Sequence, residues 1–216
     1  MKLRIAWLTI FFLALAALPL AADLAPGYDN GPINGTTDAW TIDFGYVVSN
    51  TFTGISYAEF LQFGLWEFPG DTLTSVDWSI TSGENSGTVY GQGTASGEYL
   101  KDEFISTNQY GYNIDRIYVW ATNVKLDQNQ TYWLNLFNAA VPSGDPVFWD
   151  ENSGEHCGGT GGGANCPSEA SNNAVGTIPS EAFTINSGVP TPEPSSIMLF
   201  GSGILGLAGV LRWRLF

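Results

Sequence analysis

The two cysteines, Cys157 and Cys166, enclose a glycine-rich stretch and stand beside the single histidine of the chain, His156. Two thiols this close in sequence predict a disulfide that closes a small loop, provided that the chain leaves the reducing cytoplasm. A metal site made by His156, both thiolates and a nearby carboxylate is the alternative. The sequence lacks the paired Cys-x-x-Cys spacing of such sites, so we expect no metal here.

Carboxylates are the other groups that can do chemistry, and two adjacent pairs stand out, Asp102-Glu103 and Asp150-Glu151. A glycoside hydrolase needs two carboxyl groups that face each other across the sugar. Neighbouring residues of a strand point to opposite faces, so neither pair supplies that geometry by itself. The sequence also lacks a Gly-x-Ser-x-Gly elbow, a P-loop and a His-Glu-x-x-His motif. We therefore expect no enzyme, and a secreted hydrolase with carboxylates from separate strands is the third alternative.

Oxygen ligands of the kind that Ca²⁺ prefers gather in one acidic stretch, which contains Asp145, Asp150, Glu151 and Glu155. Their spacing matches no calcium-binding loop. We therefore expect no cofactor, with Ca²⁺ as the alternative.

Aromatic side chains offer a second way to bind a ligand, because their rings stack on sugars. Trp133 and Phe137 are expected on the strand face opposite Tyr132 and Leu134. The candidate ligand-binding residues, weighed against simple burial in the core, are Trp133, Phe137, Trp149, Asp150 and Glu151.

The composition indicates a folded domain rather than a disordered acidic tail. Charged residues make up 13% of the 216 residues and aromatic residues 14%, whereas a disordered tail is rich in charge and poor in aromatics. The net charge of −14 and the lack of a basic stripe exclude nucleic acid as a partner.

Apolar and polar residues alternate in several short stretches, which is the pattern of a strand with one buried face. The even positions from Trp40 to Val48 are apolar, and the same period recurs at 76–80 and 132–136. Clusters of Gly, Pro, Asn and Asp separate the stretches, and the turn at 68–73 predicts a hairpin. Residues 23–188 therefore predict an all-β domain, a single β-sandwich of the jelly-roll or Greek-key kind, with a barrel as the alternative.

Residues 1–22 have the three parts of a secretory signal peptide. Lys2 and Arg4 precede an apolar stretch, and the small residues Ala21 and Ala22 end it. We expect an N-terminal signal helix that signal peptidase removes at Ala21-Ala22, so that the rest of the chain is exported.

The other end combines a Pro-rich linker at 189–196, an uncharged apolar stretch at 197–211 and a basic tail at 212–216. The apolar stretch predicts a short transmembrane helix that holds the protein in a membrane. The arginines after it are expected to stay in the cytoplasm, which leaves the acidic domain outside.

The order of Pro192-Glu193-Pro194, a Gly-rich apolar helix and terminal arginines resembles the PEP-CTERM sorting signal. In that family an exosortase, a membrane cysteine protease-transpeptidase, recognises the Pro-Glu-Pro segment and removes the tail. The resemblance implies an inner-membrane intermediate, followed by the cell surface or extracellular matrix of a Gram-negative bacterium that makes extracellular polysaccharide. Thr191, where valine is usual, and the final Leu215-Phe216 are small departures from the common form.

The sequence therefore predicts an exported surface or matrix protein without enzymatic activity, processed by signal peptidase and exosortase. The second hypothesis is a carbohydrate-binding module for the extracellular polysaccharide.

Overall fold

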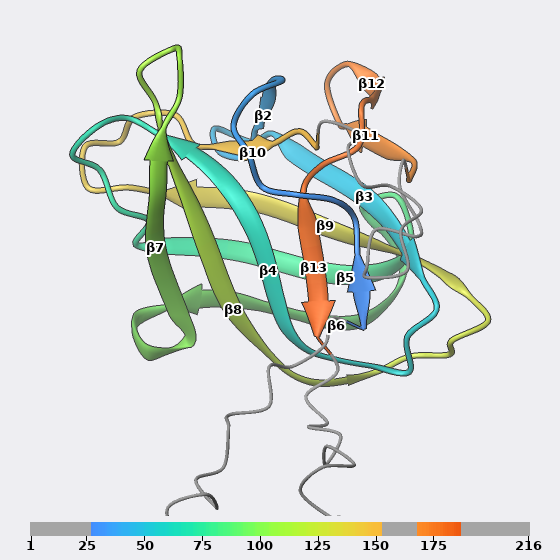
Figure 1. The fold of residues 1–216 in the computed structure, drawn as a ribbon. Helices are drawn as coiled ribbons and strands as arrows, with labels where there is room; N and C mark the ends of the chain where they lie inside the picture. Colours follow the sequence, from blue (N-terminus) through green and yellow to red (C-terminus); the bar gives the residue numbers. More distant parts are fainter. Residues whose placement is uncertain (1–26, 153–167, 187–216) are drawn as a thin grey trace, which may run out of the picture. The chain divides into compact units, whose positions relative to one another are not determined.

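The computed structural model describes residues 27–152 and 168–186, which form two antiparallel sheets (Figure 1). The predicted signal helix, the Cys157–Cys166 loop, the sorting motif and the predicted transmembrane helix lie outside the described residues. Within the described ranges, no helix has the length and apolar character needed to cross a membrane.

The first sheet, here sheet A, has seven strands. They are β1 (Tyr28–Asp29), β2 (Ala39–Thr41), β4 (Tyr57–Glu67), β7 (Leu100–Thr107), β8 (Asn113–Lys125), β10 (Phe148–Asp150) and β13 (Phe183–Asn186). The second sheet, here sheet B, has six strands in the order β12-β11-β3-β9-β5-β6. They are β3 (Val47–Thr53), β5 (Ser75–Gly83), β6 (Ser86–Ser96), β9 (Thr131–Ala140), β11 (Ala170–Asn172) and β12 (Gly176–Ile178). A single 3₁₀ turn, η1 (Gly97–Tyr99), connects β6 to β7.

Strand β4 is the centre of sheet A, because it pairs with three other strands. Along one side it pairs with β8 over almost its whole length. Along the other side it pairs first with β13 and then, near its end, with β10. Strand β1 pairs only with β13, so the last described strand lies between the first one and β4.

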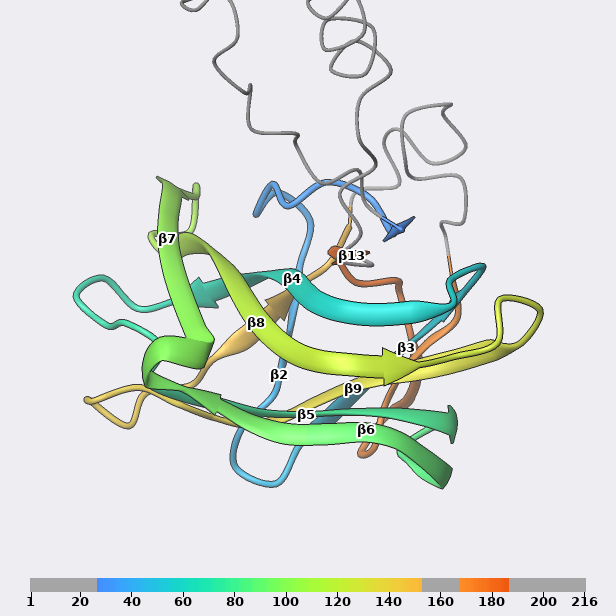
Figure 2. The same cartoon turned by 90° about the horizontal axis from the view of Figure 1, so that it is seen from below.

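The two sheets form separate layers (Figure 2), and one hydrophobic core fills the space between them. The core side chains recur at every second position of each strand, as the pleat of a β-strand requires. They include Leu61, Phe63 and Leu65 of β4, Val76, Trp78 and Ile80 of β5, and Tyr132, Leu134 and Leu136 of β9. The predicted strands at 76–80 and 132–136 are therefore confirmed, and so is the two-sheet, all-β class.

The prediction of one strand from Trp40 to Val48 is wrong. The segment forms β2 in sheet A and β3 in sheet B, with a turn between them in which Phe44 has a φ of 50° and Gly45 a φ of 87°. The N–H of Tyr46 donates to the carbonyl of Asp43 at 2.8 Å and closes the turn. Phe44 is consequently 69% exposed rather than buried.

The predicted hairpin at 68–73 is also wrong, since β4 belongs to sheet A and β5 to sheet B. The N–H of Asp71 does close a tight turn on the carbonyl of Phe68, at 3.0 Å. The chain then crosses from one sheet to the other, so residues 68–74 bridge the two layers at one end of the sandwich.

Candidate functional site

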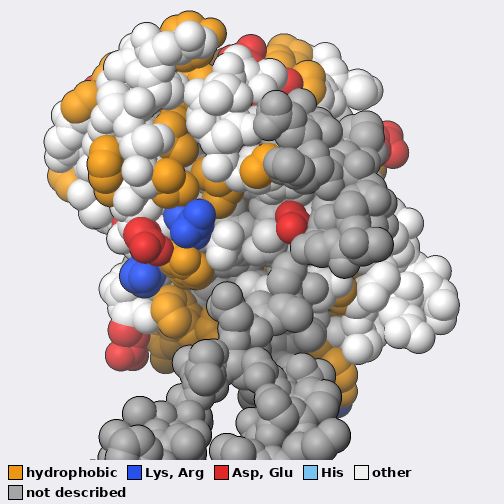
Figure 3. Space-filling model, in the orientation of Figure 1, with side chains coloured by type: hydrophobic (Ala, Val, Ile, Leu, Met, Phe, Trp, Pro, Cys, Tyr) orange, Lys and Arg blue, Asp and Glu red, His pale blue; other side chains and the backbone are white. Residues whose placement is uncertain are grey.

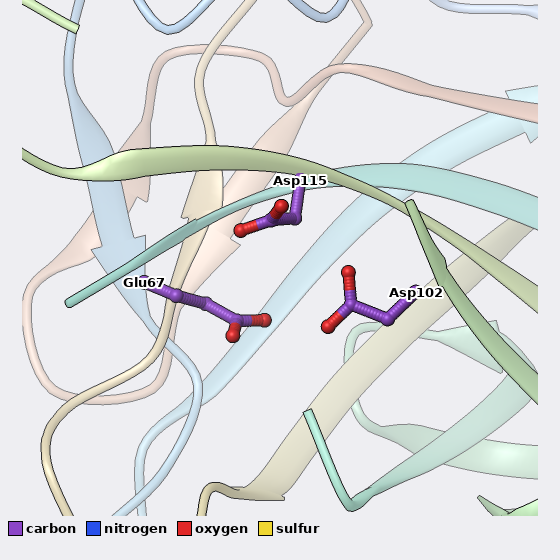
Figure 4. Close-up of side chains that lie close together, drawn as sticks. All are labelled: Glu67, Asp102 and Asp115. Atoms are coloured by element: carbon purple, nitrogen blue, oxygen red, sulfur yellow. The ribbon is translucent and has the colours of Figure 1, made fainter. Parts of the chain in front are cut away.

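Three carboxylates from neighbouring strands of sheet A converge near the connection at 68–74 that joins the two sheets (Figure 4). Glu67 ends β4, Asp115 lies near the start of β8, and Asp102 lies on β7. One oxygen atom from each of these side chains lies within 4.8 Å of the other two. We refer to Glu67, Asp102 and Asp115 as the acidic cluster.

The side-chain alternation of the strands puts all three carboxylates on the inner face of sheet A. Glu67 follows Leu65 at the next inward position of β4. Asp115 is paired with Leu65 across β4 and β8 and precedes the inward-facing Ile117. Asp102 is paired with Ile117 across β7 and β8, which brings it to the same face. The acidic cluster therefore lies on the core-facing side of sheet A, beside the last apolar core residues of these strands.

Glu67 is the most enclosed of the three. Its side chain is 0% exposed, and neither of its carboxylate oxygens has a hydrogen-bond partner. Asp115 is also buried, whereas Asp102 is partly exposed. The N–H of Leu73 donates to Oδ2 of Asp102 at 2.9 Å, which ties the connection between the sheets to β7.

Burial and mutual repulsion make these groups hard to ionise. Burial first, and then the charges of Asp102, Asp115 and Asp71, raise the pKa of Glu67 to about 8. Burial, followed by the charge of Asp102, raises the pKa of Asp115 to about 6. Burial also raises the pKa of Asp102, against the opposing effect of the Leu73 hydrogen bond.

The donor set of the acidic cluster consists of carboxylate oxygens, which suit a hard cation rather than zinc or copper.

The adjacent carboxylates Asp102 and Glu103 lie on opposite faces of β7. Glu103 points away from Asp102 and accepts hydrogen bonds from the hydroxyl of Tyr118 at 3.0 Å and from Lys101 at 3.4 Å. The predicted opposition of these two neighbours across the strand is thus confirmed.

A second candidate site is an aromatic hollow on the outer side of sheet A, with a volume of about 280 Å³. Its lining residues are Thr37, Asp38, Ala39, Trp66, Tyr110, Tyr112 and Phe148. The ring of Tyr110 stacks on Trp66 with their centroids 5.8 Å apart, and Tyr110 is 59% exposed. Indole Nε1 of Trp66 donates to Asp150 at 2.6 Å, which fixes the orientation of the indole ring on which Tyr110 stacks.

The tip of the hairpin that joins β7 to β8 holds two of these rings in place. Oδ1 of Asn108 accepts the N–H groups of Tyr110 and Tyr112, each at 3.0 Å. The N–H of Gly111 donates to the carbonyl of Asn108 at 3.1 Å, and Gly111 has a φ of 87°, which favours glycine. The aromatic hollow is thus built on an ordered turn.

Two of the predicted ligand-binding residues, Trp149 and Asp150, are 0% exposed. Trp149 packs against Phe63 and Phe183 in the core, and its Nε1 donates to the carbonyl of Ala182 at 3.1 Å. Asp150 accepts hydrogen bonds from Trp66 and from backbone N–H groups of the neighbouring loop. Burial removes both side chains from direct contact with a ligand at the surface.

Glu151, at 7% exposure, is also enclosed, and it forms an isolated bridge with Glu181. Glu181 is 0% exposed, and its carboxylate oxygens have no hydrogen-bond partner. Burial, and then the charges of Glu151, Asp150 and Asp38, raise the pKa of Glu181 well above its ordinary value. The acidic stretch that was the alternative Ca²⁺ site is therefore divided, because Asp145 is exposed, Asp150 is in the core and Glu155 lies outside the described residues.

Trp133 and Phe137 lie on the outer face of β9, as predicted, and both are half-buried. Between them Asn135 is fully buried and hydrogen-bonded to Ser49, Ser79 and Thr81. A buried polar network therefore separates the two rings on the outer face of sheet B.

Figure 3 shows few charged side chains on one face, where basic side chains lie next to acidic ones. Lys101 and Glu103 form an ion pair of this kind, with Nζ and Oε2 3.4 Å apart.

Reasoning from the sequence missed the acidic cluster and the aromatic hollow. The available signal was a break in the apolar alternation. Glu67 occupies the position where the series Leu61, Phe63, Leu65 predicts another apolar residue, and Asp115 lies two positions before Ile117, on the same face. Each break alone is unremarkable, and only the strand register shows that they meet.

One comparison with known protein families succeeds, and it concerns the C-terminal segment. Residues 190–214 match the PEP-CTERM protein-sorting motif. The chain thus carries the sorting signal that its Pro-Glu-Pro segment predicts, and the signal supports an exported protein that an exosortase processes. No curated protein matches the chain.

Proposed function

We propose that this protein is a non-enzymatic component of the cell surface or extracellular matrix, released from its C-terminal tail by exosortase. The match of residues 190–214 to the PEP-CTERM motif carries the proposal, because a sorting signal then follows a β-domain whose last described strand ends at Asn186. The tail is proposed to hold an intermediate in the inner membrane of a Gram-negative bacterium until it is cut.

The placement of the carboxylates favours a non-enzymatic role. A typical glycoside hydrolase must bring two carboxyl groups into contact with its substrate. The three that converge here face the interior, and Glu67 is 0% exposed, so a polysaccharide chain has no access to it.

Replacing Pro192 and Glu193 with alanine should block removal of the tail and leave export intact. The prolines hold the chain extended for a protease, whereas membrane insertion depends on the apolar stretch that follows. Mass mapping of the protein from the native host should find the variant with its tail in the inner membrane, and the unmodified protein shortened and outside.

The matched control replaces Pro190 and Ser195 with alanine, which flank the Pro-Glu-Pro segment on both sides. This control should be processed like the unmodified chain. If the unmodified protein keeps Phe216 in a host with a working exosortase, the tail is a plain membrane anchor and the proposal fails.

The aromatic hollow favours a second candidate function, a carbohydrate-binding module for extracellular polysaccharide. An exposed ring on a rigid turn, with carboxylate and hydroxyl groups beside it, is the combination that binds a sugar face and its hydroxyls. Tyr110 provides the ring, and Asp38 and Thr37 provide the polar groups. This candidate moves the binding site from Trp133 and Trp149 to the tip of the β7–β8 hairpin.

A Tyr110→Ala variant should weaken binding to polysaccharide from the host by about tenfold, the loss expected for one stacked ring. The fold should persist, since Tyr110 is 59% exposed. Tyr99→Ala is the control, because Tyr99 is 52% exposed and lies outside the hollow. Equal retention of both variants and of the unmodified protein on immobilised polysaccharide would argue against the module.

A further inference from the structure

We propose that Glu67, Asp102 and Asp115 form a Ca²⁺ site that fastens strand β7 to the rest of sheet A. The inference is independent of the sorting signal and of the aromatic hollow. It rests on the spacing of the three carboxylates, on the unpartnered oxygens of Glu67 and on the lack of a neighbouring cation.

The spacing fits one calcium ion. Ca²⁺ binds oxygen at about 2.3–2.6 Å, so two ligands of the same ion lie at most about 4.6–5.2 Å apart. One oxygen each from Glu67, Asp102 and Asp115 meets this limit, with all three within 4.8 Å of one another. Mg²⁺ demands near-ideal octahedral geometry at about 2.0–2.1 Å, whereas Ca²⁺ tolerates the irregular geometry of side chains from three strands.

The orientation of Glu67 is what distinguishes this cluster from an ordinary acidic patch. Its carboxylate points toward Asp102 (Figure 4), is 0% exposed and receives no hydrogen bond. A buried carboxylate with neither a hydrogen bond nor a counter-charge is costly to keep ionised. A bound cation supplies both the ligand for its oxygens and the compensating charge.

No basic side chain within residues 27–152 and 168–186 performs that task. Lys101 is paired with Glu103 on the other face of β7. Arg116 follows Asp115 in β8 and therefore points to the opposite face, where it stands across from Glu103 in the register. Lys125 lies at the far end of β8, paired with Tyr57. The acidic cluster thus carries up to three negative charges without a described partner of opposite sign.

Solvent access and the surrounding charge also suit a cation. Asp102 is partly exposed, which gives an ion access from solvent. Asp71, on the connection between the sheets, adds further negative potential near Glu67. Ca²⁺ takes six to eight oxygen ligands, and water and backbone carbonyls commonly complete its shell.

A bound ion would cross-link strand β7 to the rest of sheet A. Strand β7 is an edge strand of sheet A, where its pairing partner is β8. Its pairing is irregular between Phe104 and Ser106, just beyond Asp102. Coordination by residues of β4, β7 and β8 would join the edge strand to the central strand of its sheet.

The test uses the full chain in detergent, freed of metal by a chelator and titrated with CaCl₂. We expect one ion per chain, with a Kd on the order of 10⁻⁴–10⁻³ M, as in extracellular calcium modules. Saturating Ca²⁺ should raise the Tm by about 5–10 °C relative to the chelated protein, because the ion binds only the folded state. MgCl₂ at the same concentration should give a much smaller shift.

The decisive variants are Glu67→Gln and Asp115→Asn, which keep the shape of the side chain and remove its charge. In chelator they should be as stable as the unmodified protein or more so, since a repulsive charge is gone. The Ca²⁺-dependent rise in Tm should disappear. Glu103→Gln is the matched control: it removes a carboxylate from the same strand, but from the opposite face, and should leave the Ca²⁺ effect unchanged.

Two results would overturn the proposal. One is an unmodified protein whose Tm and calorimetric titration do not respond to CaCl₂. The other is a Ca²⁺ response of equal size in Glu67→Gln, Asp115→Asn and the unmodified protein, which would place the ion elsewhere. If a buried variant fails to fold, Asp102→Asn, at the partly exposed member of the cluster, provides the same comparison.

Discussion

Replacing Trp149 with alanine should lower the free energy of unfolding by about 3–5 kcal/mol, the range for large-to-small substitutions of a buried aromatic residue. The indole is 0% exposed and packs between Phe63 and Phe183, so its removal opens a cavity in the core. The carbonyl of Ala182 also loses the hydrogen bond from Nε1. Urea unfolding followed by circular dichroism would measure the change.

Trp133→Ala is the control for this substitution, since both tryptophans belong to the ligand-binding set that the sequence suggested. Trp133 is half-buried on the outer face of β9, so its loss should cost about 1 kcal/mol. A Trp149→Ala variant as stable as Trp133→Ala would contradict the assignment of Trp149 to the core.

The second large effect is a loss of stability as the pH rises from about 4 to 8, measured in chelator to exclude metal effects. Burial raises the pKa of Asp150 to about 6, against three opposing hydrogen bonds, and raises the pKa of Glu181 well above its ordinary value. The folded state then binds more protons than the unfolded state, so stability is complete below the unfolded pKa and falls as the pH climbs through the folded one. The ionisation of Asp150 alone should lower the free energy of unfolding by on the order of 2–3 kcal/mol as the pH rises from about 4 to about 6.

Glu181→Gln isolates one part of this slope. The variant cannot ionise beside Glu151, Asp150 and Asp38, so it should be more stable than the unmodified protein at about pH 8 and similar at about pH 4.5. Glu169→Gln, at an exposed carboxylate, should follow the unmodified protein at every pH. Parallel curves of urea midpoint against pH for Glu181→Gln and the unmodified protein would rule out a raised pKa at Glu181.

The sequence was sufficient for the linear features of this chain. Pro192-Glu193-Pro194 could be recognised because a sorting signal is a continuous segment, and the match of residues 190–214 to the PEP-CTERM sorting motif confirms it. The strands at 76–80 and 132–136 could be predicted because every second side chain enters one core.

The same alternation misled at 40–48. Apolar residues occupy the even positions both before and after the turn, so the period of two runs through it without interruption. The pattern therefore cannot show that β2 and β3 belong to different sheets. Phe44 and Gly45, both with positive φ, form the turn, and nothing in the pattern marks a phenylalanine for that conformation.

The acidic cluster could not be predicted because it depends on register. Glu67, Asp102 and Asp115 meet only if β8 pairs with β4 on one side and with β7 on the other, each in the observed alignment. A shift of a single residue would turn Asp115 to the outer face. Strand pairing over such distances in sequence is decided by the packing of the whole core, which no local stretch of residues encodes.

The position of β13 between β1 and β4 has a consequence for the order in which this protein acquires its structure. The side chain of Asn30 donates to the carbonyl of Glu181 at 2.6 Å, and β1 pairs in sheet A with β13, the last described strand, where Tyr28 is opposite Ile185. Contacts so distant along the chain form slowly, because a long loop must close before they contribute. A chain that emerges from a translocation channel N-terminus first therefore keeps sheet A incomplete until residue 186 has followed. Sheet A is therefore completed by β13, which ends at Asn186, just before the matched sorting motif at 190–214.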